Sequence, residues 1–229
     1  MMYAIKIIAL VCFLSASASS LLALDKGSLI FYPEAGLGLS SGFATALNPE
    51  SASRFFGSPN VLFKEPQAKA GLSWNIGCGI DYALSGLLAA TSGLFIGRTT
   101  HTIVYKKTGS AKNDLEVNTD FLYLTIPAGA RLYTDLLMLG GGLYIGIPLS
   151  CDSSYKFGTT TEANIDALTT IGLFIDAGMN FTDINNLMVF FRFKSDLSYA
   201  FKDEHYIVTK ARTLSLNLTV AYRFKTYKI

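Results

Sequence analysis

Alternation of apolar with small or polar residues over the segment 137–149 is the feature that most limits how this chain can fold. The odd positions carry Leu or Ile, with Gly141 as the exception, and the even positions carry Met138, glycines, Tyr144 and Pro148. A strand places these two sets on opposite faces of a sheet, because successive side chains point to opposite sides. The segment therefore predicts a strand with one oily face and one small or polar face.

The same rhythm recurs in eight segments along the chain. They are residues 29–39, 70–82, 87–104, 121–132, 137–149, 170–181, 187–199 and 213–224. In the third segment the pattern does not decide which residues face outward. We favour Leu88, Ala90, Leu94 and Ile96, which turns Phe95 inward unless a bulge resets the alternation. Each segment is about as long as a tilted membrane-crossing strand, and eight is the smallest common number in a closed membrane barrel.

The composition indicates a chain whose surface is apolar. Of its 229 residues 50% are hydrophobic and only 16% are charged, yet after the N-terminus no run approaches the ~18 apolar residues of a spanning helix. In lipid the backbone must then be paired by closing a barrel. We predict an all-β, closed, antiparallel, up-and-down transmembrane β-barrel. The alternative is a secreted lipocalin-type barrel with its oily face inward, which the Gly-rich opposite face disfavours.

The N-terminal residues have the pattern of an export signal. Lys6 precedes an apolar stretch over 7–14 and a small-residue stretch over 15–19. We predict a signal peptide within residues 1–23, cleaved after Ala18 or, as second choice, after Ala23, followed by a barrel domain over residues 24–229. An uncleaved anchor is the alternative, but the apolar stretch is short for a bilayer.

The connections between the segments alternate in length. Those near 83–86, 134–136 and 182–186 are tight, and those over 41–69, 105–120, 151–169 and 200–212 are long and polar. Barrels of outer membranes have short periplasmic turns and long extracellular loops. We therefore expect both termini in the periplasm and extracellular ligands, if any, at the long loops.

Charged side chains gather on the face opposite the oily one. The inward phase contains Glu34, Asp81, Arg131, Asp176, Arg192, Lys194, Asp196 and Arg223. We interpret them as a salt-bridge network that plugs the barrel, since buried ions must be paired and eight strands enclose little more than their own side chains. A proton relay or a selectivity filter is the alternative.

Outward aromatic residues fall near the predicted strand ends, as in the aromatic girdles at membrane interfaces. Near the periplasmic ends are Phe31, Tyr82, Phe181, Tyr222 and Phe224, and near the outer ends are Trp74 and Tyr199.

Two short elements support a resemblance to known barrels. The run Tyr123-Leu124-Thr125-Ile126-Pro127 resembles a Tyr-Leu-x-Ile-Pro element of many bacterial barrel domains, and the alternating terminal strand up to Phe224 resembles the signal read by the barrel-insertion machinery. With the strand rhythm and loop asymmetry, the chain resembles the small outer-membrane barrels of the OmpX, OmpW and OmpA transmembrane type. The resemblance implies outer-membrane lipids and the insertion machinery as partners; residues 226–229, which continue past the last aromatic residue, depart from it.

Function is less constrained than fold. We favour a non-enzymatic, monomeric surface barrel in adhesion or envelope integrity, with an OmpW-like conduit for small hydrophobic solutes as the alternative. A lipid A-modifying enzyme would need His101 or His205, which lie near outer strand ends; we interpret both as solvated loop residues. We expect no cofactor, metal site or nucleic-acid partner, and free thiols at Cys78, on an oily face, and Cys151, just past a strand.

Overall fold

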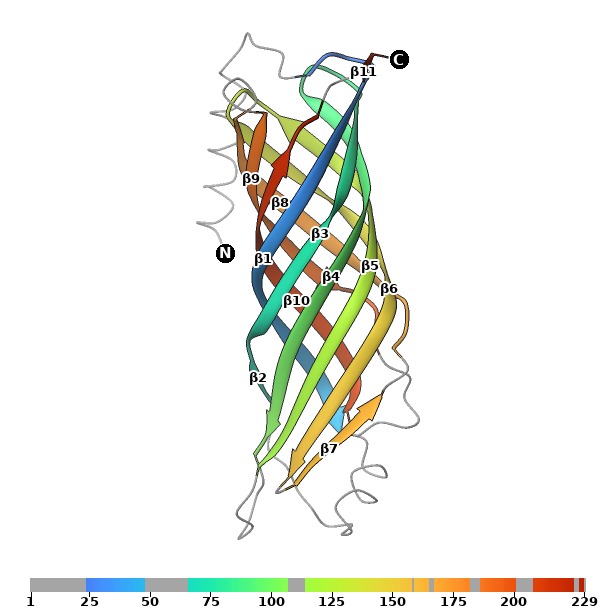
Figure 1. The fold of residues 1–229 in the computed structure, drawn as a ribbon, viewed down its shortest axis with the longest axis vertical. Coiled ribbons are helices and arrows are strands. Elements are labelled where there is room, and N and C mark those ends of the chain that lie inside the picture. The colour runs from blue at the N-terminus through green and yellow to red at the C-terminus, as the bar shows by residue number, and fades with distance from the viewer. Residues whose placement is uncertain are drawn as a thin grey trace.

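The chain forms one antiparallel sheet, shown in Figure 1. This computed structural model describes residues 24–47, 66–106, 114–157, 159–164, 167–181, 186–200, 208–224 and 227–228. The strands in these ranges are β1 (Ser28–Leu47), β2 (Gln67–Lys69), β3 (Gly71–Ala83), β4 (Leu88–Tyr105), β5 (Leu115–Tyr133), β6 (Leu137–Phe157), β7 (Thr159–Asn164), β8 (Thr170–Phe181), β9 (Leu187–Asp196), β10 (Val208–Tyr222) and β11 (Tyr227–Lys228). No helix in these ranges is long and apolar enough to cross a membrane.

The eight long strands close into a ring. In ring order they are β1, β3, β4, β5, β6, β8, β9 and β10, and β10 pairs back onto β1, with Gly36 opposite Thr219. Every neighbouring pair is antiparallel. Closure removes the free edges of the sheet, so that the ring strands satisfy each other's backbone groups. The predicted fold class is confirmed, and Figure 1 shows the strands strongly tilted along a narrow barrel.

Short turns lie at one end of the barrel. β3 is followed after four residues by β4, and Thr134 closes the turn from β5 to β6 by accepting a hydrogen bond from the Leu137 backbone N–H at 2.8 Å. Between β8 and β9, residues 182–185 lie outside the described ranges, and Asn186 has a left-handed φ of 54°, which Asn tolerates. The same end holds Leu24, whose N–H donates to the Gly86 carbonyl.

At the opposite end the predicted loop boundaries are wrong. β1 continues to Leu47, β4 to Tyr105 and β6 to Phe157, whereas β5 and β10 already begin at Leu115 and Val208. The sequence predicts loops over 41–69, 105–120, 151–169 and 200–212, because the apolar alternation ends there. Backbone pairing needs no oily face, and these segments contain many Thr, Val and Tyr residues, which favour strands.

The extended parts of β4, β5 and β6 form what we call the outer arm, residues 98–105, 115–120 and 150–157. β2 pairs with its β4 side and β7 with its β6 side. In Figure 1 this arm lies at the lower end, away from β11 and the C-terminus.

The oily faces point outward around the ring. Leu37 and Leu72 are each 64% exposed, and on β4 Leu94 is 53% exposed whereas Phe95 is 2% exposed. The favoured phase of the third segment is therefore confirmed. Because the exposed face is oily and the enclosed face carries the charges, the structure contradicts the lipocalin-type alternative.

Candidate functional site

The barrel interior is filled in layers, beginning with an apolar plug at the short-turn end. Its buried members include Leu24, Ile30, Tyr133, Met138 and Met188. They come from the ends of several ring strands and from the segment before β1. These side chains fill this end of the lumen with apolar groups.

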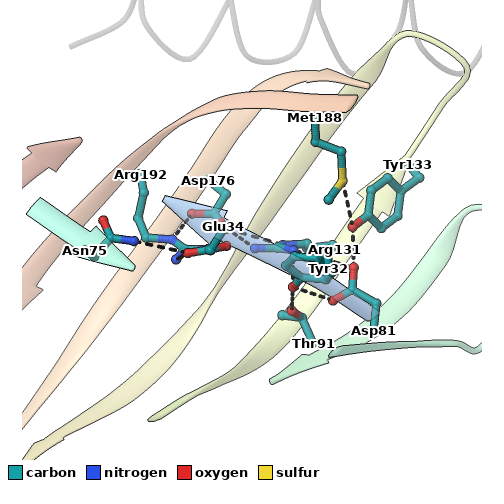
Figure 2. Close-up of polar contacts among 10 residues, drawn as sticks. All are labelled: Tyr32, Glu34, Asn75, Asp81, Thr91, Arg131, Tyr133, Asp176, Met188 and Arg192. Atoms are coloured by element: carbon teal, nitrogen blue, oxygen red, sulfur yellow. Dashed lines mark hydrogen bonds and ion pairs between the residues drawn. The ribbon is translucent and has the colours of Figure 1, made fainter. Parts of the chain in front are cut away.

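An ionic network lies next to the plug, and Figure 2 shows how its groups meet. Arg131 Nη2 lies 2.7 Å from Asp176 Oδ2, and Arg192 Nε lies 2.8 Å from Asp176 Oδ1. Arg192 also pairs with Glu34, and Arg131 Nη1 lies 3.5 Å from Asp81 Oδ2. Asp176 thus joins both guanidinium groups, and each Arg has a second acid of its own.

Neutral polar groups complete this network. The Tyr32 hydroxyl donates to Asp81 Oδ1 at 3.0 Å, and the Tyr133 hydroxyl also donates to Asp81. On the other side Asn75 Nδ2 donates to Glu34 Oε1 at 3.3 Å, and Asn75 Oδ1 accepts from Asn217 Nδ2 at 3.1 Å. Buried ions of this kind are stable only when their remaining hydrogen-bonding groups are also satisfied.

Aromatic rings surround the two guanidinium groups. The Arg192 Cζ lies 5.1 Å from the Phe190 ring centroid and 5.4 Å from that of Phe95. The Arg131 Cζ lies 5.1 Å from the Tyr32 centroid and 5.3 Å from that of Phe190. Contacts of this kind favour a cation away from water. The inward turn of Phe95 on β4 is therefore a structural part of the network.

Beyond the network the lumen narrows to a small polar cavity. It has a volume of about 40 Å³ and is lined by Lys194, Asp196, Tyr144 and Thr125 among others. A water needs roughly 10–15 Å³ on this measure. The cavity has room for a few waters at most.

The structure places all eight predicted lumen charges inside the barrel. Five form the ion pairs just described: Glu34, Asp81, Arg131, Asp176 and Arg192. The other three do not join these pairs. Asp196 accepts hydrogen bonds from Tyr144 and from the Thr213 N–H, Lys194 lies over the Tyr144 ring, and Arg223 lies over the Tyr133 ring. The eight comprise four acids and four bases, so their formal charges cancel.

The predicted girdle residues lie on the outside of the barrel. Six of them are exposed and Phe181 is partly exposed: Phe31, Trp74, Tyr82, Tyr199, Tyr222 and Phe224. β11 adds an aromatic residue that the sequence did not single out, because Tyr227 packs edge-on against Phe31 with ring centroids 6.3 Å apart. Tyr227 and Lys228 thereby continue the seam along β1, where Leu29 pairs with Tyr227.

Two predictions about the outer arm are wrong. Cys151 lies within β6 and is buried, and His101 is 2% exposed within β4 instead of solvated in a loop. The register of β6 against β5 shifts between Leu122 and Tyr123. That bulge near Pro148 exchanges the two faces of β6, which turns Cys151 inward. Cys78 and Cys151 are both free, as predicted, and His205 lies outside the described residues.

Burial changes the chemistry of these two outer-arm side chains. It lowers the pKa of His101 to about 4, so the ring is neutral at physiological pH, and it raises the pKa of the Cys151 thiol to about 12, so the thiol stays protonated. The His101 ring packs against Phe121 with centroids 5.8 Å apart. Neither ring nitrogen has a hydrogen-bond partner among the described residues.

The outside of the outer arm is polar where the rest of the ring is oily. Arg98 Nε donates to both carboxylate oxygens of Asp120, at 2.7 and 2.9 Å, and Lys69 Nζ lies 2.8 Å from Glu116 Oε1. Charge at mid-bilayer costs about 2–4 kcal/mol for each Lys or Arg. We therefore expect the hydrocarbon to end between the oily belt and the Arg98–Asp120 pair, with the arm in water.

Within the described residues no group of three or more His, Cys, Asp or Glu side chains is arranged to hold a metal ion.

Comparison with known proteins gave matches by structure alone, since no family model and no curated protein matches this sequence. The attachment invasion locus protein Ail of Yersinia pestis is 12% identical, with 87% of this chain and 100% of that chain covered and a TM-score of 0.47. Neisserial surface protein A is 13% identical, with 85% and 97% covered and a TM-score of 0.43. The Escherichia coli outer-membrane protease OmpT is 8% identical, with 85% and 97% covered and a TM-score of 0.45. With its closed ring, oily exterior and charged interior, the chain has the fold of the small outer-membrane β-barrels.

Proposed function

We propose that the protein is a non-enzymatic, monomeric barrel of the bacterial outer membrane, whose outer arm and long loops act in adhesion or in envelope integrity. The observation that supports this proposal is the distribution of polar and apolar surface. The lumen is packed, the outside of the ring carries an oily belt, and polar strand segments continue past the belt at the long-loop end. Function usually resides on such projecting segments.

The same proposal fixes the orientation and partners. Outer-membrane lipids surround the belt, the short-turn end with both termini faces the periplasm, and residues 1–23 are a signal removed after Ala18 or Ala23. The C-terminal strand, β10 with β11, is the part that the insertion machinery reads.

Two competing functions have less support. A conduit for hydrophobic solutes needs a passage, whereas the described lumen is filled by the Arg131–Asp176–Arg192 network and its aromatic rings. An enzyme needs a base in hydrogen-bond contact with a nucleophile, and the His101 ring has no such partner among the described residues.

A hairpin deletion tests the proposal. Replacing residues 152–164 with an Asn-Gly turn removes β7 and the outer-arm part of β6, with its pairing to β5, and leaves the part of every ring strand that carries the oily belt. We expect the variant to fold in the outer membrane and keep heat-modifiable migration on gels. Attachment of the cells to surfaces, or their resistance to detergents, should fall to the level of cells that lack the protein.

Two results would contradict the proposal. If complete removal of the protein left attachment and detergent resistance unchanged, a surface role would be wrong. Step conductance of the purified protein in planar bilayers would instead favour the conduit.

A further inference from the structure

A polar chamber lies inside the lumen, beyond the ionic network. It is the cavity of about 40 Å³ described above, and every ring strand except β1 contributes to its lining. Most of the described lining residues carry a hydroxyl group, and the charged ones among them are Lys194 and Asp196 of β9. The Arg131–Asp176–Arg192 network takes no part in this lining. The chamber is therefore a polar space separate from the ion pairs.

Three buried hydroxyl oxygens of the chamber have no hydrogen-bond partner among the described residues. They are Thr99 Oγ1 on β4, Tyr123 Oη on β5 and Thr213 Oγ1 on β10. Tyr123 is only 9% exposed and Thr213 only 8%. Leaving a buried hydroxyl unpaired is unfavourable, so nearly all such groups in folded proteins bond to protein or to ordered water. Three of them around one cavity indicate a ligand with several hydrogen-bonding sites.

The Lys194 side chain lines the same chamber. Its Nζ lies 5.9 Å from the Tyr144 ring centroid, and none of the ion pairs among the described residues includes it. An ammonium group has donors and no acceptor. Because a charge removed from bulk water needs hydrogen-bond partners, the ligand must also offer acceptors to Lys194.

The charges in and around the chamber disfavour an ion as that ligand. Lys194 repels a cation and Asp196 repels an anion. The adjoining network also repels an anion, because its three acids and two bases sum to a formal charge of −1. An apolar molecule would leave the hydroxyl groups unpaired. The ligand is therefore uncharged, polar, and both a donor and an acceptor.

The volume selects among uncharged polar ligands. Since one water needs roughly 10–15 Å³, a volume of 40 Å³ holds about three waters and excludes a sugar. A buried water acts as donor and as acceptor, which suits both the ammonium and the hydroxyl groups. We propose that the chamber binds a cluster of about three ordered waters, which joins Lys194 to the hydroxyls of Thr99, Tyr123 and Thr213. This inference does not depend on the proposed surface function.

The cluster gives the outer part of the lumen a second set of links across the barrel. Asp196 already connects β9 to its neighbours, because it accepts hydrogen bonds from the Tyr144 hydroxyl and, at 3.0 Å, from the Thr213 N–H. Waters between Lys194 and the three hydroxyls connect β9 to β4 and β5 as well. Lys194 is thereby positioned by water and not by a carboxylate.

Two threonines of β10 provide a matched test. The hydroxyls of Thr213 and Thr219 are both buried and without a partner among the described residues, but Thr213 lines the chamber and Thr219 does not. In urea unfolding from lipid vesicles, Thr213→Val should lower the folding equilibrium constant by about 3- to 10-fold, as expected for one lost hydrogen bond. Thr219→Val should leave it unchanged or raise it. Equal effects of the two variants would overturn the proposal.

A double-mutant cycle tests the link to Lys194. Tyr123→Phe removes one orphan hydroxyl, and Lys194→Met removes the ammonium and keeps an unbranched side chain. Since no direct hydrogen bond joins these two side chains among the described residues, a coupling between them reports the waters. We expect the combined loss of folding equilibrium constant to be at least about threefold smaller than the product of the single losses. Single losses that simply multiply would contradict the bridge.

A high-resolution crystal structure of the mature protein, grown in bromide, identifies the ligand without any variant. We expect water density within hydrogen-bond distance of Lys194 Nζ and of the three hydroxyls, and no anomalous bromide signal in the chamber. Bromide at this place would make it an anion site and overturn the proposal. A chamber closed by rearranged side chains, with direct hydrogen bonds among the same groups, would overturn it as well.

Discussion

Asp176 is the residue on which the lumen network depends most. Its carboxylate lies 2.7 Å from Arg131 Nη2 and 2.8 Å from Arg192 Nε, and none of its surface is exposed. Asp176→Asn keeps the size of the side chain and removes its charge, so that both guanidinium groups lose a buried counterion. Removing one partner of a buried ion pair costs about 3–5 kcal/mol. We expect the free energy of unfolding to fall by that amount.

Urea unfolding in lipid vesicles measures this loss. Trp74 is the only Trp of the chain and lies on the outside of the barrel, so its fluorescence reports whether the strand is in lipid. Asp152→Asn is the matched control, because Asp152 is an exposed acid of the outer arm; it should change stability by less than about 0.5 kcal/mol. A loss of less than about 1 kcal/mol for Asp176→Asn would contradict a stabilising network.

Three further predictions concern the belt, the arm and the seam. Phe191→Arg puts a charge on the oily face, so it should destabilise the folded barrel by about 2–4 kcal/mol and hinder its folding into vesicles. Lys194→Gln, on the other face of β9, should fold normally. Heat-modifiable migration on gels measures the folded fraction of each variant, and equal folding of the two would contradict the assigned faces. Burial lowers the pKa of His101 to about 4, below its ordinary value of ~6.5. Between these two pH values the unfolded chain binds a proton that the folded protein excludes, so the free energy of unfolding should fall as the pH drops from about 6.5 to about 4. His101→Phe should flatten this dependence of the urea midpoint, and an unchanged pH dependence would show that the ring is not buried. Tyr227→Ala removes the edge-on contact with Phe31 and should lower stability by about 0.5–1.5 kcal/mol; an unchanged midpoint would show that β11 does not support the seam.

The faces of the strands could be predicted because side chains alternate with a period of two. That rule alone puts Leu37 and Leu72 outward and Glu34 and Asp176 inward, and the alternation of turn lengths supports the count of eight strands in the ring. It fails where the phase changes within a strand. The bulge near Pro148 reverses the faces of β6, so the sequence pattern places Cys151 in a loop although the strand continues through it.

The contacts within the lumen could not be predicted in the same way. Glu34 and Arg192 are 158 positions apart in the chain, and they meet only because of the stagger of β1 against β9 around the ring. The polar residues Tyr32, Asn75 and Tyr133 carry no sequence signal beyond their inward phase. The sequence predicts a solvated His101 because the apolar pattern ends before this residue, although the strand does not.

Contact of the oily face with hydrocarbon is the central claim, and Cys78 offers a direct test of it. This free cysteine lies exposed on β3, between Pro33 of β1 and Leu94 of β4. A Cys151→Ser protein labelled with bimane at Cys78 and folded into vesicles should be strongly quenched by brominated lipids and little by iodide. The same label at Ser154→Cys, in a protein that also carries Cys78→Ser, should show the reverse. Quenching of the Cys78 label by iodide alone, with the chain monomeric and soluble without detergent, would contradict a membrane barrel.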